Sequence, residues 1–208
     1  MQMPNYTALL LAAGYSRRFG GAKLLQPLSN GIALGLQAAL NLRAAQIPVL
    51  VVVNPEQTAL TQLYQQYQFP TLINVDAQHG LGTSIAAGIQ ASQAANGWLI
   101  ALADMPFIQP ATLRTLWQAL NQGAALVAPY YQGQRGHPVG VSAAFKADLL
   151  ALNQDHGAQR LLQQQQALLQ LIQTQDAGVV WDIDTPSDLP RGQTPPVTKA
   201  CPYSEVLL

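Results

Sequence analysis

Apolar runs of strand length alternate along the chain with longer segments in which apolar residues recur every three to four positions. This alternation is typical of a mainly parallel sheet covered by helices. The run 48–53 is apolar throughout, as in strands that are buried on both faces. In the first half, the pattern predicts strands at 6–12, 48–53, 70–75 and 98–103, with helices at 32–46, 56–67 and 84–95.

The second half of the chain is less regular. Pro106 closes the fourth strand, and Pro110 is expected in the first turn of the next helix. After these come an apolar stretch at 124–128, a glycine-rich loop at 133–140, helices at 143–152 and 157–168, and strands at 169–174 and 179–183. We therefore predict an α/β fold, a single-domain three-layer α/β/α Rossmann-like arrangement over residues 1–189. The Pro-containing tail 190–208, which includes Cys201, is expected to be flexible.

Composition narrows the function classes. The 208 residues suit one domain, and only 10% of them are charged, with ten basic residues balancing ten acidic ones. A neutral chain without a Lys/Arg run lacks the field that attracts nucleic acid or anionic lipid. We find neither an apolar run of membrane length nor a leader, so a cytoplasmic protein is expected. The single cysteine excludes an intramolecular disulfide.

Basic residues, which are few in this chain, gather in the loop after the first expected strand. Residues 11–23 hold three of the ten basic residues together with three glycines. Glycines let the backbone approach a ligand, and Arg18 and Lys23 can neutralise phosphates, so the loop predicts a polyphosphate site. A P-loop is excluded because Ala22 separates Gly21 from Lys23, and Gly14-Tyr15-Ser16 breaks the dinucleotide motif Gly-x-Gly-x-x-Gly in this loop. A merely solvated glycine loop is the competing interpretation.

Acidic side chains follow several of the expected strands. Asp104 comes directly after a buried strand, where an unpaired carboxylate is costly unless a metal or a basic group meets it. Mg²⁺ commonly takes one or two carboxylates and completes its shell with substrate phosphates, which suits Asp104 with one further acid. Asp182 and Asp184, two apart on an expected strand, should share a face. For Asp182 a purely structural role is equally compatible with the sequence.

A second glycine loop, Gly80-Leu81-Gly82-Thr83-Ser84, opens an expected helix. Its amides and hydroxyls lie at the positive helix end, where they can hold a base, a ribose or a phosphate. A local cap formed by Thr83 or Ser84 is the alternative. His137 stands in a glycine-flanked loop close to Arg135, an unusual place for a core histidine.

Taken together, five motifs resemble those of the nucleotidyltransferases with a glycosyltransferase-A-like fold, in particular the branch that transfers guanylyl or cytidylyl groups to molybdenum cofactor. The resemblance covers the chain to about residue 188. The motifs are Leu11-Ala12-Ala13-Gly14-x-Ser16-x-Arg18-Phe19-Gly20 followed by Lys23, Gly80-Leu81-Gly82-Thr83-Ser84, Asp104-Met105-Pro106, Gly136-His137-Pro138-Val139-Gly140, and Asp182-Ile183-Asp184-Thr185-Pro186.

The resemblance implies transfer of a nucleoside monophosphate from an NTP to the phosphate of molybdenum cofactor, with Mg²⁺ and release of pyrophosphate. Arg18, Lys23 and Asp104 would be catalytic, and Asp104 and Asp184 would hold the metal. Arg135, His137 and Asp182 would bind the acceptor. The nucleotide-binding residues would be Leu11, Ala12, Ala13, Gly14, Ser16, Asn54, Asp76, Gly80, Gly82, Thr83 and Ser84.

Several alternatives remain at this point. Leu-Ala-Ala-Gly favours CTP, because guanylyl enzymes of the branch usually carry Leu-Ala-Gly-Gly. Transfer to a sugar phosphate or to methylerythritol phosphate is disfavoured, since those relatives usually place Pro before the lysine where this chain has Ala22. A non-catalytic protein that binds the nucleotide or delivers the cofactor is the alternative from another class. Transient contact with a molybdoenzyme or its chaperone is a further expectation.

Overall fold

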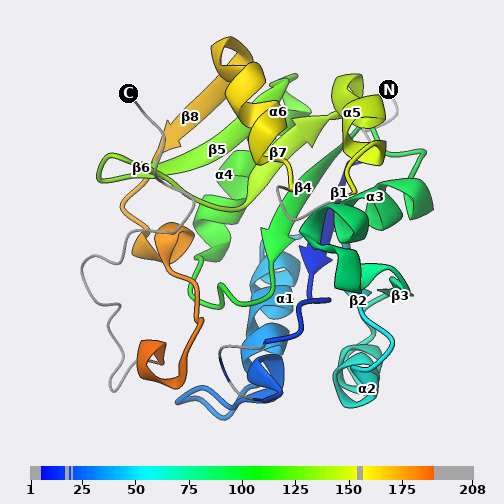
Figure 1. Cartoon of the computed structure of the whole chain (residues 1–208). Coiled ribbons are helices and arrows are strands. Elements are labelled where there is room, and N and C mark those ends of the chain that lie inside the picture. Colours follow the sequence, from blue (N-terminus) through cyan, green and yellow to red (C-terminus); the bar gives the residue numbers. More distant parts are fainter. Residues whose placement is uncertain (1–5, 17–18, 20, 154–156, 190–208) are drawn as a thin grey trace.

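The computed structural model describes residues 6–16, 19, 21–153 and 157–189. It contains one eight-stranded sheet with the order β3-β2-β1-β4-β7-β5-β6, and β8 pairs with β5 (Figure 1). The strands are β1 Tyr6–Leu11, β2 Val49–Val53, β3 Thr71–Ile73, β4 Gly97–Leu102, β5 Leu126–Tyr131, β6 Gln134–Arg135, β7 Val139–Ser142 and β8 Leu169–Gln173.

Most of the sheet is parallel, as the sequence predicts. β1 lies between β2 and β4 and is parallel to both, and β3 continues this parallel order beyond β2. β7 is antiparallel to β4 and to β5, so β5 and its parallel neighbour β8 run in the direction of the first four strands. The fold class is therefore confirmed, with an antiparallel strand inserted beside β4.

Helices cover both faces of the sheet (Figure 1). Along β1, Ala8 and Leu10 face one core cluster while Leu9 and Leu11 face the other, as the two-residue period of a strand requires. The first cluster packs against α1 Leu34–Ala44, α2 Thr58–Gln66 and α4 Pro110–Asn121, and the second against α3 Leu81–Ala91, α5 Lys146–Leu150 and α6 Gln159–Gln164. In the described part of the chain, no helix has the length and apolar character that a membrane crossing requires.

The strand expected at 179–183 does not form. Residues Ala177–Val180 make a 3-10 helix, and no strand follows them up to residue 184. The apolar pattern there reflects burial instead, because Val179, Trp181 and Ile183 pack into the first core cluster. Gly178 lies against the backbone of Phe107 so closely that a Cβ would stand 2.3 Å from that carbonyl oxygen. Residues 177–184 therefore pack onto the end of the sheet as an irregular segment, which we call the strap.

Candidate active site

A pocket of about 440 Å³ opens at the carboxyl ends of β1 and β4. The sheet order reverses at β1, and ligands of open α/β sheets bind at such switch points. The pocket is lined by Leu11, Ala12, Ala13, Gly14, Tyr15, Ser16, Lys23, Leu24, Ala77, Gln78, Gly80, Leu81, Ser84, Leu102, Asp104 and Asp184. Residues from four of the five motifs thus converge on one hollow: the two glycine loops, the Asp-Met-Pro motif through Asp104 and the Asp-Ile-Asp-Thr-Pro motif through Asp184.

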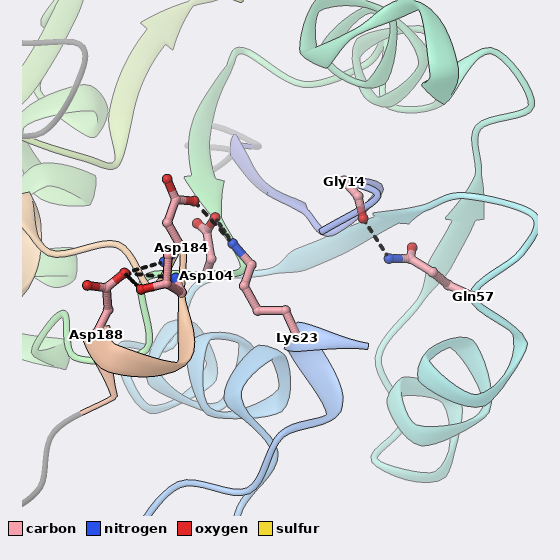
Figure 2. A network of polar contacts seen from close by, with 7 residues as sticks. Gly14, Lys23, Gln57, Asp104, Asp184 and Asp188 are labelled. Carbon is pink, nitrogen blue, oxygen red and sulfur yellow. Dashed lines mark hydrogen bonds and ion pairs between the residues drawn. The ribbon is translucent and has the colours of Figure 1, made fainter. Parts of the chain in front are cut away.

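One side of this pocket is charged, and we call it the charged wall: Lys23, Asp104 and Asp184. Lys23 Nζ lies 2.9 Å from Asp104 Oδ2 and 3.6 Å from Asp184 Oδ1 (Figure 2). Lys23 is only 7% exposed, and a lysine so deeply buried requires anionic partners. The sequence-predicted basic residue and the two predicted metal ligands therefore form one cluster.

The Asp104 carboxylate retains an unused oxygen. Its Oδ1 is buried and has no hydrogen-bond partner among the residues that the structure describes. A buried carboxylate oxygen without a partner is energetically costly, so it calls for a cation or a hydrogen-bond donor. Within the described ranges, no three His, Cys, Asp or Glu side chains are grouped so as to hold a metal ion. A divalent ion at Asp104 and Asp184 would therefore need further ligands from a bound phosphate, which is how Mg²⁺ is commonly held.

Asp182 belongs to the same electrostatic cluster. Burial raises the pKa of its carboxyl group, and the negative charges of Asp104 and Asp184 raise it further. The expectation that Asp182 and Asp184 share one face of a strand is wrong, because this part of the strap is not in a strand. Asp184 reaches the pocket by another route: Ile183 N donates to Asp104 O at 3.0 Å and ties the strap to the end of β4.

Three neutral amides lie outside the pocket lining and hold the two glycine loops, and we call them the amide wall: Asn54, Gln57 and Asn74. Asn54 is fully buried and donates through Nδ2 to Ala13 O at 3.0 Å, while its Oδ1 accepts from Glu56 N. Gln57 Nε2 donates to Gly14 O at 3.1 Å (Figure 2). Asn54, predicted to contact the nucleotide, is thus engaged with the loop backbone and lies outside the pocket lining.

The second glycine loop is held in the same manner by Asn74. Its Nδ2 lies 3.0 Å from both Thr83 Oγ1 and Ser84 Oγ, and its Oδ1 accepts from Asp76 N. Gly80 precedes α3 with a φ of +116°, a conformation that favours glycine. Of the predicted residues in this region, Gly80 and Ser84 line the pocket, whereas Gly82, Thr83 and the exposed Asp76 are not in its lining.

The predicted acceptor residues lie beside the strap. His137 N donates to Val179 O at 2.8 Å, and the adjoining peptide bond to Pro138 is cis. Gly136 lies so close to Val179 that no side chain would fit. Burial, aided by the positive charge of Arg135, lowers the pKa of His137 to about 4. Its Nδ1 has no hydrogen-bond partner in the described part of the chain. Arg135 and His137 are not in the lining of the pocket, and the strap connects them to it.

The structure does not describe every residue that the sequence singled out. Arg18 and the tail 190–208 with Cys201 fall outside the described residues, so those predictions stay predictions. Sequence reasoning missed Gln57, Asn74 and Asp188. The spacing Thr185-Pro186-Ser187-Asp188 is a helix-capping pattern that points to Asp188, and Asn74-Val75-Asp76 is typical of an Asx turn.

Comparison with known proteins decides the family. The model of the MobA-like NTP transferase domain matches residues 8–169. The chain belongs to this family. As a MobA-like NTP transferase it has the fold and the converging loops described above. Its membership of this family supports the assignment of the chain to the nucleotidyltransferases.

The similar proteins carry different names. The chain is 31% identical over 200 residues to the purine catabolism protein PucB of Bacillus subtilis, covering 90% of this chain and 96% of that one. It is 28% identical to nicotine blue oxidoreductase of Paenarthrobacter nicotinovorans, covering 91% and 97%. Among solved structures, Rv0371c of Mycobacterium tuberculosis superposes with a TM-score of 0.79 at 24% identity, covering 90% and 96%. A second structure of Rv0371c is a complex with manganese.

Proposed function

We propose that this MobA-like protein transfers a nucleoside monophosphate, with CMP favoured, from an NTP to the phosphate of molybdenum cofactor and releases pyrophosphate. The observation that carries the proposal is the Lys23–Asp104–Asp184 cluster beside the first glycine loop. A cavity of about 440 Å³ is of the size that small-molecule sites have. Positive charge, carboxylates and a glycine loop together suit a metal-bound nucleoside triphosphate.

The first loop would receive the phosphates. Asn54 and Gln57 occupy the carbonyl oxygens of Ala13 and Gly14, whose partial negative charge would otherwise repel an anion. Lys23 carries three N–H donors; one donates to Asp104, the ammonium also forms an ion pair with Asp184, and a remaining donor would reach a phosphate oxygen. Arg18 is proposed to add the second positive charge. Catalysis would then rest on positioning and on neutralising charge at the leaving pyrophosphate.

Asp104 and Asp184 are proposed to hold Mg²⁺. The unused Oδ1 of Asp104 and the oxygen-only donor set both fit a hard divalent cation, and the manganese complex of Rv0371c supports a divalent metal. The bound cation would supply positive charge to the triphosphate. Lys23 is shared by two carboxylates, so the cluster has one negative charge in excess, which a cation would neutralise.

In the proposed reaction an acceptor phosphate oxygen forms a bond to the α-phosphorus, and the bond from that phosphorus to the bridging oxygen of the β-phosphate breaks. Pyrophosphate leaves with the electron pair. Arg135, His137 and Asp182 are proposed to bind the acceptor. With a pKa of about 4, His137 is neutral near pH 7 and would act through hydrogen bonds. A general base is unnecessary because the attacking phosphate is already ionised.

The preference for CTP rests on the Leu11-Ala12-Ala13-Gly14 sequence of the first loop. Transfer of guanylyl groups, or transfer to a sugar phosphate or methylerythritol phosphate, is the nearest alternative. We further propose that the protein works in the cytoplasm and passes its product to a molybdoenzyme or to its chaperone by transient contact.

The test is to incubate the protein with Mg²⁺, molybdenum cofactor and each of the four NTPs, and to measure pyrophosphate together with the mass of the product. We expect CTP to give pyrophosphate and a cytidylylated cofactor, and Asp104→Ala to abolish both. Saturable binding of nucleotide and cofactor with no release of pyrophosphate would favour a delivery protein. The 28% identity to nicotine blue oxidoreductase motivates a second arm, in which consumption of NADH without any NTP would contradict the transferase.

A further inference from the structure

Asp188 is a buried carboxylate that lies behind the charged wall. It is 6% exposed and ends the 3-10 helix Pro186–Asp188. Its Oδ2 accepts three hydrogen bonds: from Asp184 N at 3.1 Å, from Thr185 N at 2.8 Å and from Thr185 Oγ1 at 2.9 Å (Figure 2). A carboxylate oxygen that accepts several N–H and O–H bonds holds their donors in one arrangement. One oxygen atom thus fixes the backbone at two successive residues.

These two residues are where Asp184 enters the pocket. The Asp184 side chain is 34% exposed, so packing alone does little to hold it against Lys23. Its position depends on the backbone on both sides. Ile183 N is tied to Asp104 O on one side, and Asp188 holds Asp184 N and Thr185 N on the other. The pocket lining includes Asp184 and not Asp188.

We propose that Asp188 is a positioning residue that presents Asp184 to the metal of the nucleotide complex. The inference deepens the proposed function and rests on its metal pair, Asp104 and Asp184. Groups that orient metal ligands affect metal affinity and activity by about 10- to 100-fold when they are removed. Asp188 acts on the ligand through main-chain hydrogen bonds, so its acceptor oxygen matters more than its charge.

The probe is Mn²⁺, titrated by electron paramagnetic resonance in the presence of the non-hydrolysable analogue α,β-methylene-CTP. We expect Asp188→Ala to weaken Mn²⁺ binding about tenfold or more. Asp188→Asn retains an acceptor oxygen and should stay within about threefold of the wild type. In the pyrophosphate assay, raising the metal concentration should restore the rate of Asp188→Ala, because Asp104 and Asp184 are still present.

Asp176 offers a matched control. It is also a buried carboxylate, 5% exposed, and it accepts backbone hydrogen bonds from Gly178 N at 3.0 Å and Gln109 N at 2.7 Å. Asp176→Ala removes the same kind of local anchor from a different turn. It should lower Tm as Asp188→Ala does, while leaving Mn²⁺ affinity within about twofold of the wild type.

Each outcome separates this inference from the proposed function. A wild type that binds no Mn²⁺ with the analogue would contradict the proposed metal site itself. Normal binding by the wild type with unchanged affinity in Asp188→Ala would overturn the role of Asp188 alone. The role of Asp188 would also be overturned if Asp176→Ala lost as much Mn²⁺ affinity as Asp188→Ala, or if Asp188→Asn did. If Asp188→Ala does not fold, Thr185→Val removes the hydroxyl that donates to Asp188 Oδ2 and accepts from the Asp188 backbone N–H, leaves the Asp188 carboxylate in place, and should weaken Mn²⁺ binding about two- to threefold.

Discussion

The charged wall of the pocket and the amide wall behind its loops are built from different chemistry. On the amide wall, Asn54 and Asn74 follow neighbouring strands, β2 and β3, and each forms an Asx turn while its Nδ2 anchors a loop of the pocket. On the charged wall, Lys23 joins two carboxylates that come from distant parts of the chain. The neutral amides hold the backbone of the loops in place and add no net charge to the pocket. The charged groups, in contrast, create the electric field inside it. We therefore expect the amide wall to govern nucleotide affinity and the charged wall to govern turnover.

The largest effect is expected from Asp104→Asn. The change keeps the side-chain volume but removes the charge that meets Lys23 and the proposed metal. We expect kcat to fall about a thousandfold with little change in Tm, since lost charge stabilisation of a transition state has this magnitude. Steady-state pyrophosphate release and a thermal melt measure both. A variant with more than about a tenth of the wild-type kcat would contradict the expectation that the charged wall governs turnover.

Lys23→Met should come next. It removes the ammonium group and leaves Asp104 and Asp184 as adjacent carboxylates without their shared partner. We expect kcat to fall about a hundredfold, and Mg²⁺ dependence to become steeper as the metal takes over the neutralising role. Lys23→Arg is the matched control for charge alone. If Lys23→Met raised only KM, Lys23 would belong functionally with the amide wall.

Asn74→Ala addresses the amide wall. It leaves the N–H of Asp76 without its acceptor and removes the donor to Thr83 and Ser84. A free-energy loss of about 2 kcal/mol in urea unfolding is expected, because buried polar groups lose their partners. KM for the nucleotide should rise several-fold while kcat stays within about twofold. A fall in kcat comparable to that of Lys23→Met would show that the two walls are not separable.

Protonation of His137 tests the acceptor end of the strap. Its pKa of about 4 in the folded state lies below the ordinary value of 6.5, so the unfolded chain binds this proton more readily. The contribution of His137 to the free energy of unfolding is therefore complete above pH 6.5 and decreases as the pH falls towards 4. NMR titration of the imidazole should show no midpoint near 6.5, and His137→Gln should flatten that part of the stability profile. A midpoint at 6.5 would indicate a solvated ring.

The smallest effect is expected from Gln57→Ala. Its hydrogen bond to Gly14 O lies near the surface, and its Oε1 also accepts from Asn54 N at 3.1 Å, so about 1 kcal/mol of stability should be lost. KM for the nucleotide should rise about two- to fivefold with kcat unchanged. The same steady-state assay measures it, with Gln65→Ala on the exposed side of α2 as a control that should leave KM unaltered.

The parallel strands were predicted because they follow from local pattern, and Lys23 and Asp104 were expected in one site because both follow strands; the place of Asp184 beside Asp104 was implied by the family resemblance. The strap was mistaken for a strand, since Val179, Trp181 and Ile183 are apolar for burial and not for pairing. Asn54 was expected to contact the nucleotide, and its buried hydrogen bond to Ala13, which joins segments far apart in the chain, was not predicted. Such long-range pairing leaves no local signal. The capping pattern before Asp188 was local and therefore readable.

The hydrogen bond from Ile183 N to Asp104 O has a consequence for biosynthesis. A chain that emerges from the ribosome at about 5–20 residues per second folds its N-terminal parts first. Lys23 can pair with Asp104 once β4 is made, but Asp184 arrives only after nearly all the described chain has been synthesised. Until then a nascent chain holds just one of the two carboxylates. Nucleotide chemistry would thus begin only after the last strap residues have docked, and truncated translation products would be inert.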